Sequence, residues 1–232
     1  MITPLREVVS GQLWVKEHPV RLPGGVQFLT RMTVIRLNGG LCLHSPVEID
    51  APTRSSINGL GEVRAIIAPS TVHHLFMASA QQSFPDARTY GIRGLEAKRK
   101  DLHFDELLGD EPAAFWAGQM DQVVIGNRLM REVEFFHRAS RSLIATDLVE
   151  NFRAETLGTN VVLRALMRVL GMWGHPRPAP ELRWFTRDRD SARLALDRLL
   201  DWDFDLAIIA HGELLDHEPK QAIREAWRWV LE

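Results

Sequence analysis

Cysteine is nearly missing from this sequence: among 232 residues, only Cys42 carries a thiol. A single cysteine excludes an internal disulfide framework and suits a reducing compartment. Cys42 lies in an apolar run, which favours an inert core thiol over a reactive one. Residues 1–6 lack the basic region and apolar stretch of a signal peptide. We therefore expect a cytoplasmic protein.

Long apolar runs and an excess of positive charge are also lacking. No window approaches the ~20 apolar residues of a membrane helix, so no membrane association is expected. The 28 basic and 30 acidic residues give a net charge of −2, which is not the basic footprint of a nucleic-acid-binding protein. The Gly-x-Ser-x-Gly elbow, the Gly-x-x-x-x-Gly-Lys-Ser/Thr phosphate loop and the Gly-x-Gly-x-x-Gly turn are absent. The expected partner is a small-molecule substrate or ligand; the oligomeric state stays open.

The composition is that of an ordinary globular protein, with 45% hydrophobic and 25% charged residues. The first 50 residues favour β structure, including a hairpin of residues 32–37 and 41–44 about Asn38-Gly39-Gly40. Further strands are predicted at 63–68, 122–125, 132–136, 142–146 and 206–210, and helices at 53–60, 72–83, 151–170, 190–200 and 219–231.

This order predicts mixed sheets covered by helices, in one domain spanning residues 1–232, because residues 175–180 form a loop rather than a linker. The helix predicted at 151–170 carries an apolar stripe at helical spacing, formed by Val161, Val162, Ala165, Leu166 and Val169. Residues 86–119 have no clear pattern. We expect that segment to overhang a cleft and to influence substrate choice.

Histidine or aspartate follows four of the predicted strands. They are His44 after residues 41–43, His73 and His74 after 63–68, Asp147 after 142–146, and His211 after 206–210. A twisted sheet places such strand ends along one edge, and imidazole and carboxylate are ligands for zinc and similar ions. His73 and His74 would be about 100° apart on a helix, so only one could point straight at a given site. Gly212 would let the backbone turn sharply beside His211.

The other histidines are interpreted as structural. His137 would lie near a hairpin turn, about 25 Å along the strand from Asp147, and bond to Ser140 or Ser142. The remaining histidines lie in polar or loop contexts: His18, His103, His175 and His217.

The strand-end residues resemble those of the metallo-β-lactamase-fold superfamily, whose motif reads His-x-His-x-Asp-His. The six matching positions run from Pro69 to His74, so that Pro69 and Thr71 replace the first two histidines and His73 replaces the aspartate. The last histidine of the motif is retained as His74.

Other positions extend this resemblance over nearly the whole chain. His44 stands where the family has an aspartate at the end of its first hairpin, Asp147 matches the bridging aspartate and His211 the final histidine. The family's remaining histidine has no counterpart near Gly126 and Asn127. The pattern looks like an uncharacterised bacterial branch of the superfamily, known only as a domain of unknown function. The resemblance implies an α+β fold, a four-layer αβ/βα sandwich.

In that superfamily, one or two metal ions activate water to attack an ester, amide, thioester or phosphodiester. The resemblance therefore implies a hydrolase with one retained divalent ion. Zinc is the first choice for this ion, and iron and manganese are the alternatives. His74, Asp147 and His211 would bind it, with help from His73 or His44. Two other readings stay open. One is a metal-free relic of the fold that binds a small molecule or a protein, and the other is an iron-dependent redox protein.

Overall fold

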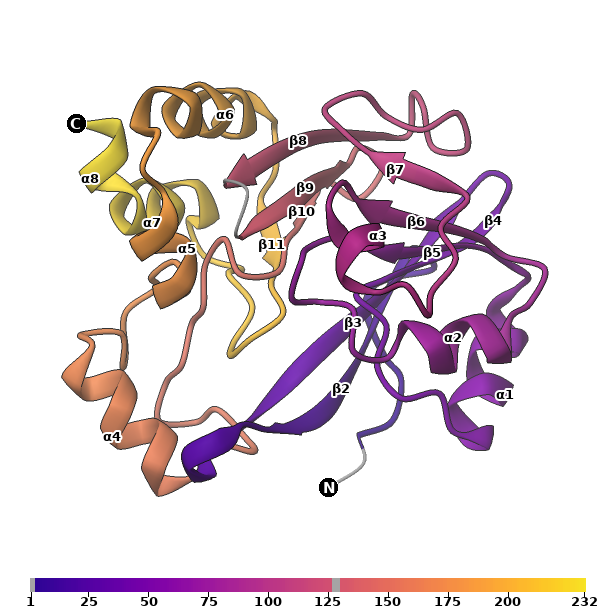
Figure 1. Ribbon diagram of the computed structural model, residues 1–232, viewed down its shortest axis with the longest axis horizontal. Coiled ribbons are helices and arrows are strands. Elements are labelled where there is room, and N and C mark those ends of the chain that lie inside the picture. The colour runs from indigo at the N-terminus through magenta and orange to yellow at the C-terminus, as the bar shows by residue number, and fades with distance from the viewer. Residues whose placement is uncertain (1–2, 127–129) are drawn as a thin grey trace.

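Two β-sheets form the centre of the computed structural model, which describes residues 3–126 and 130–232 (Figure 1). The larger sheet has the order β1-β2-β3-β4-β5-β6-β7 and the smaller one β11-β10-β9-β8. Strands β1 to β4 are antiparallel, β4 to β7 are parallel, and β10 pairs in parallel with β11. The larger sheet consists of β1 (Arg6–Val9), β2 (Leu13–Arg21), β3 (Gln27–Leu37), β4 (Gly40–His44), β5 (Val63–Ala68), β6 (Arg88–Ile92) and β7 (Glu106–Leu108). The smaller sheet consists of β8 (Met120–Gly126), β9 (Arg131–His137), β10 (Ser142–Ile144) and β11 (Leu206–Ile208).

The two sheets pack face to face, with helices outside each. Ile66 of the larger sheet and Phe135 of the smaller one belong to the same buried core, to which α1 (Ala51–Leu60), α2 (Met77–Ser83) and α3 (Leu95–Lys98) also contribute. A second core joins Leu143 of the smaller sheet to Leu196 and Trp227 of the C-terminal helices. Those helices are α5 (Pro180–Phe185), α6 (Arg189–Asp201), α7 (Pro219–Ala226) and α8 (Arg228–Leu231). The expected α+β four-layer αβ/βα sandwich is confirmed.

The predicted hairpin is confirmed, since β3 pairs with β4 from Thr33–His44 to Leu37–Gly40. The helix predicted at 72–83 is wrong in its first turn. It begins at Met77, because the Ser70 hydroxyl accepts the backbone N–H groups of Val72 and His73 at 3.2 and 2.9 Å and holds a turn there.

The helix predicted at 151–170 is shorter than expected. Only α4 (Val161–Val169) forms, and Asn160 caps its start by accepting the backbone N–H of Leu163 at 3.0 Å. Upstream, Glu150 pairs with Arg177 and Asn151 with Gly212, which keeps the backbone extended. In Figure 1, α4 lies beside the far end of the β2–β3 hairpin, where the short helix η1 (Pro23–Gly25) connects the strands.

Two further segments also differ from what the sequence analysis gives. Residues 86–119 contain β6, α3 and β7 and complete one edge of the larger sheet. The helix predicted at 219–231 is divided at Trp227 into α7 and α8.

Within the described part of the chain, every helix is too short or too polar to cross a lipid bilayer.

Candidate metal centre

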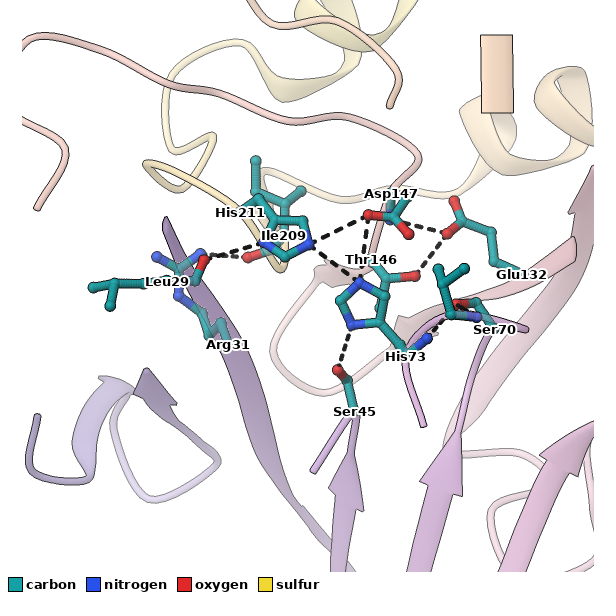
Figure 2. Close-up of polar contacts among 11 residues, drawn as sticks. Leu29, Arg31, Ser45, Ser70, His73, Glu132, Thr146, Asp147, Ile209 and His211 are labelled. Atoms are coloured by element: carbon teal, nitrogen blue, oxygen red, sulfur yellow. Dashed lines mark hydrogen bonds and ion pairs between the residues drawn. The ribbon is translucent and has the colours of Figure 1, made fainter. Parts of the chain in front are cut away.

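Three of the five predicted site residues meet where strands of both sheets end (Figure 2). His73 follows β5, Asp147 follows β10 and His211 follows β11. The strands are parallel within each of the pairs β4–β5 and β10–β11, so the carboxyl ends of each pair lie at one edge of its sheet. The three side chains meet where these two edges lie together. The expectation that separate strand ends converge is correct for these three side chains.

The three side chains form a nearly equilateral triangle of ligand atoms. His73 Nε2 lies 3.2 Å from His211 Nε2 and 3.4 Å from Asp147 Oδ1, and His211 Nε2 lies 3.4 Å from the same oxygen. Tetrahedral zinc with bonds of about 2.0–2.1 Å would separate its ligand atoms by about 3.3–3.4 Å. The triangle therefore has the dimensions of one face of a zinc coordination tetrahedron.

Hydrogen bonds on the far side of each imidazole direct Nε2 inward. His211 Nδ1 lies 3.1 Å from the Leu29 carbonyl, which can only accept, so Nδ1 carries a proton and the neutral imidazole would offer the lone pair of Nε2 to an ion. His73 Nδ1 lies 2.8 Å from the Ser45 hydroxyl, which can accept its proton in the same way. Such outer contacts set the tautomer and orientation of metal-binding histidines.

Ser45 is held in an unusual backbone conformation at this position. It is buried and has φ of 52°, in the left-handed region that few non-glycine residues adopt. Strain of this kind persists where the surroundings enforce it, and it is frequent at functional sites. Here it places the Ser45 hydroxyl against His73.

A buried carboxyl group supports Asp147 from behind. Glu132 Oε2 accepts the Asp147 backbone N–H at 2.9 Å and the Thr146 hydroxyl at 2.6 Å. Burial raises the pKa of Glu132, and burial together with Glu132 raises the pKa of Glu134 well above its usual value. A protonated Glu134 can donate to Glu132, which leaves Glu132 as the acceptor that fixes the Asp147 backbone.

The charges within the triangle are opposite and adjacent. Burial by itself would lower the pKa of His73, but Asp147 and Glu132 outweigh it, so the pKa of His73 is raised. Burial by itself would raise the pKa of Asp147, but His73 and His211 outweigh it, so this carboxyl has a pKa far below its usual range. Without an ion, Asp147 therefore favours the protonated form of His73, and His73 favours the ionised form of Asp147.

His44 and His74, also predicted as metal ligands, lie outside this triangle. His74 Nδ1 is 2.8 Å from Arg99, and burial with Lys98 and Arg99 lowers the pKa of His74 to about 4. Because Ser70 holds a turn instead of a helix, His73 and His74 separate, one directed to the cluster and one to Arg99.

The His44 ring packs edge-on to Phe135 with centroids 5.5 Å apart. Its Nε2 is buried without a hydrogen-bond partner, and burial with His73 lowers the pKa of His44 to about 3. This geometry does not test whether His44 or His74 binds a metal ion, so both roles stay predictions.

Other sequence predictions have mixed outcomes. His137 Nδ1 lies 2.7 Å from the Ser140 hydroxyl, which confirms the structural role predicted for this histidine. Asn127, where a further histidine of the motif would be expected, lies outside the described residues. The supporting residues Ser45 and Glu132 were not predicted, although Ser45 directly follows His44 and could have been considered with it.

A pocket of about 550 Å³ opens beside the triangle, and His73, Asp147 and His211 line its floor. Its walls come from the β2–β3 hairpin, the segment after β10, α4 and the start of α5. No lining residue belongs to 86–119, so the expectation that this segment overhangs the cleft is wrong for the described structure. Lys98 and Arg99 of that segment instead brace the turn that carries His73, through the Thr71 carbonyl at 2.7 Å and through His74.

Glu150 is an acidic side chain of the pocket that the sequence analysis missed. It is partly exposed, but its Oε2 is covered and has no hydrogen-bond partner. Burial raises the pKa of Glu150 to about 8. Glu150 therefore keeps its proton at neutral pH and can lose it a little above.

We expect Glu150 to make the stability of the metal-free protein depend on pH. Unfolded glutamate ionises above about pH 4.5, while Glu150 in the folded state stays protonated until about pH 8, so the free energy of unfolding falls as pH rises between these values. With allowance for its partial exposure, the fall is on the order of 2 kcal/mol. Urea unfolding at pH 5 and pH 9 should show this fall in the free energy of unfolding of the wild type. In Glu150→Gln the difference between the two pH values should be smaller by about the contribution of Glu150. An equal fall in both proteins would contradict the assignment.

Solved structures that are similar to this chain include metallo-β-lactamases. DIM-1 metallo-β-lactamase exposed to ceftazidime is 15% identical with a TM-score of 0.67, and 99% of each chain is covered. A metallo-β-lactamase from Pontibacter korlensis is 14% identical with a TM-score of 0.65, covering 98% of this chain and 99% of that one. FIM-1 from Pseudomonas aeruginosa, in its mono-zinc form, is 11% identical with a TM-score of 0.63, covering 99% and 96%. At these identities the likeness establishes the metallo-β-lactamase fold.

The model of one protein family matches residues 10–160, well over half of the chain. The chain belongs to that family, described as a domain of unknown function, DUF4336. No curated protein matches the sequence. The predicted membership of an uncharacterised branch with this fold is confirmed.

Proposed function

We propose that this protein is a metal-dependent hydrolase with a single divalent ion held by His73, Asp147 and His211. The observation that carries the proposal is the triangle of two Nε2 atoms and one carboxylate oxygen with edges of 3.2–3.4 Å. Three protein ligands and an open fourth position are the usual set for catalytic zinc. The same two-histidine, one-carboxylate set also suits iron or manganese. Zinc is the first choice because the spacing fits its short bonds.

A bound ion would supply the Lewis acidity that polarises a carbonyl group and makes water a nucleophile near neutral pH. The protein's own residues supply orientation and proton handling. Ser45 and the Leu29 carbonyl fix the two imidazoles, and Glu132 fixes Asp147. The Glu150 carboxyl group lines the pocket and can deliver a proton to a leaving group there, because its pKa of about 8 keeps it protonated at pH 7.

A metal-free binding module is the second candidate. It is favoured by the ion pair of His73 with Asp147 at 3.4 Å, which already satisfies the buried cluster electrostatically. The proposed compartment for either function is the cytoplasm, supported by the single buried cysteine.

Metal content and ester hydrolysis test the proposal together. We expect the tag-free wild type to contain about one equivalent of metal by elemental mass spectrometry and to hydrolyse activated esters. His211→Ala should lose the metal and lower the rate by at least about a hundredfold, since one of only three ligands is removed.

His137→Ala is the matched control, because His137 is an equally buried histidine whose partner is Ser140. It should retain both metal and activity. Metal-free wild-type protein, even after reconstitution with zinc, iron and manganese, would overturn the hydrolase proposal in favour of the binding module.

A further inference from the structure

The pocket beside the metal centre is lined mostly by apolar side chains. Phe28 of β3, Phe152 and the buried face of α4, Leu163 and Met167, form its interior. Its volume of about 550 Å³ lies within the range of sites for small organic ligands. An occupant therefore gains most by burying hydrocarbon against these walls.

No lysine or arginine is found among the described residues that line the pocket, and two of its histidines, His73 and His211, belong to the metal centre on the floor. Its acidic groups are Asp147, Glu150 and Glu181. Arg164 and Arg168 of α4 lie over the Trp173 ring instead, at 5.8 and 4.9 Å from its centroid. An anionic group buried against the apolar walls, away from the metal centre on the floor, would lose its hydration without gaining a cationic partner, and that is costly.

The mouth of the pocket is apolar as well. Leu75 is 59% exposed, Trp184 63% and Leu166 39%, and all three also line the pocket. Large exposed apolar side chains gathered at one pocket are typical of a binding groove. Because these side chains continue the interior walls outward, the groove suits an elongated hydrocarbon group that enters from solvent.

We propose that the pocket binds an aliphatic chain of an uncharged substrate, an ester with an apolar acyl group, and rejects anionic analogues. The reaction rests on the proposed hydrolase function, whereas binding of the chain does not. In the reaction, the acyl carbon gains a bond to the oxygen of water and loses its bond to the alkoxy oxygen, which takes a proton. The products are a carboxylic acid and an alcohol, and no oxidant or reductant is required.

Binding is tested with two ligands of equal chain length that contain no ester bond, 1-octanol and octane-1-sulfonate. By isothermal titration calorimetry, we expect 1-octanol to bind at least tenfold more tightly than octane-1-sulfonate. Leu166→Asp should weaken 1-octanol binding at least tenfold. Val169→Asp, on the same helix but 85% exposed and outside the pocket, should change it less than twofold.

Two results would overturn the proposal: equal affinity for the two ligands, or equal loss in the two variants. Thermal melting of both variants shows whether α4 is still folded, and Leu163→Ala provides a second change in the same wall without an added charge.

A hydrolysis assay separates this inference from the function on which it rests. With p-nitrophenyl octanoate and the mono-p-nitrophenyl ester of octanedioic acid, we expect at least tenfold preference for the uncharged ester. Tight 1-octanol binding without hydrolysis of either ester would overturn the hydrolase function and leave the ligand class standing. Faster hydrolysis of the anionic ester would overturn the ligand class and leave the hydrolase function standing.

Discussion

Zinc affinity is expected to fall about tenfold for each pH unit below the raised pKa of His73. The imidazolium of His73 is stabilised by the neighbouring Asp147 carboxylate, so the metal-free protein holds a proton where the ion must bind. Because the pKa of His73 is raised, this competition begins at a higher pH than it would for an ordinary histidine. Asp147 adds no second proton in this range, since its own pKa is far below its usual value.

Competition with a zinc chelator at pH 5.5, 6.5 and 7.5, corrected for the chelator's own protonation, measures this dependence. We expect zinc affinity to fall from pH 7.5 to pH 5.5, with a slope that approaches tenfold per unit at the lower end of the range. Affinity that does not change with pH would show that His73 is not a ligand.

His74→Ala is the control for this prediction. The pKa of His74 is lowered to about 4, so it carries no proton in the measured range, and its Nδ1 is engaged with Arg99. We expect the variant to keep both the affinity and its pH dependence. Loss of zinc in His74→Ala would instead support the ligand set that the family motif implies.

The strand ends could be predicted from sequence because their signals are local. Apolar runs ending at His44, Asp147 and His211 are visible in a few residues each, and parallel strands bring such ends to one edge. Choosing between His73 and His74 required the turn made by Ser70, and a helix predicted from Val72 onward obscured it. Adjacent histidines differ in direction by local backbone geometry, which periodicity alone does not resolve.

The supporting contacts could not be predicted because they join distant parts of the chain. His211 and the Leu29 carbonyl are separated by 182 residues, and His73 and Ser45 by 28. A backbone carbonyl leaves no signal in the sequence, since every residue carries one. Glu132 lies in the strand predicted at 132–136, and nothing in that pattern indicates that its side chain would accept the backbone N–H of Asp147.

The pocket was missed for a different reason. The apolar stripe predicted for this helix is exposed at all five of its positions, and the buried residues of α4 are not among them, because periodicity does not say what an apolar face packs against. In the structure Leu163 and Met167 are buried, while Val161 and Val169 are 78% and 85% exposed. The apolar surface of α4 is therefore divided between the pocket and solvent. A stripe of Val and Leu residues in the sequence does not show which of them face the pocket and which face solvent.

Replacement of Gly212 by alanine is expected to destabilise the fold and remove the metal site together. Gly212 has φ of +85°, and a Cβ at this position would overlap the Asn151 carbonyl, which belongs to the backbone and cannot rotate away. Asn151 also donates its N–H to the His211 carbonyl at 3.1 Å, so any shift that relieves the overlap moves His211. We expect a loss of at least about 3 kcal/mol in the free energy of unfolding, from overlap added to backbone strain.

Gly171→Ala separates these two contributions. Gly171 has φ of +67° but open space around its Cβ position, so only the strain of a left-handed alanine remains, about 1 kcal/mol. Urea unfolding and zinc stoichiometry should show Gly171→Ala mildly destabilised with its metal retained, and Gly212→Ala strongly destabilised with its metal lost. Equal stability of the two variants, each with a full complement of zinc, would mean that the contact between Gly212 and Asn151 does not hold His211 in place.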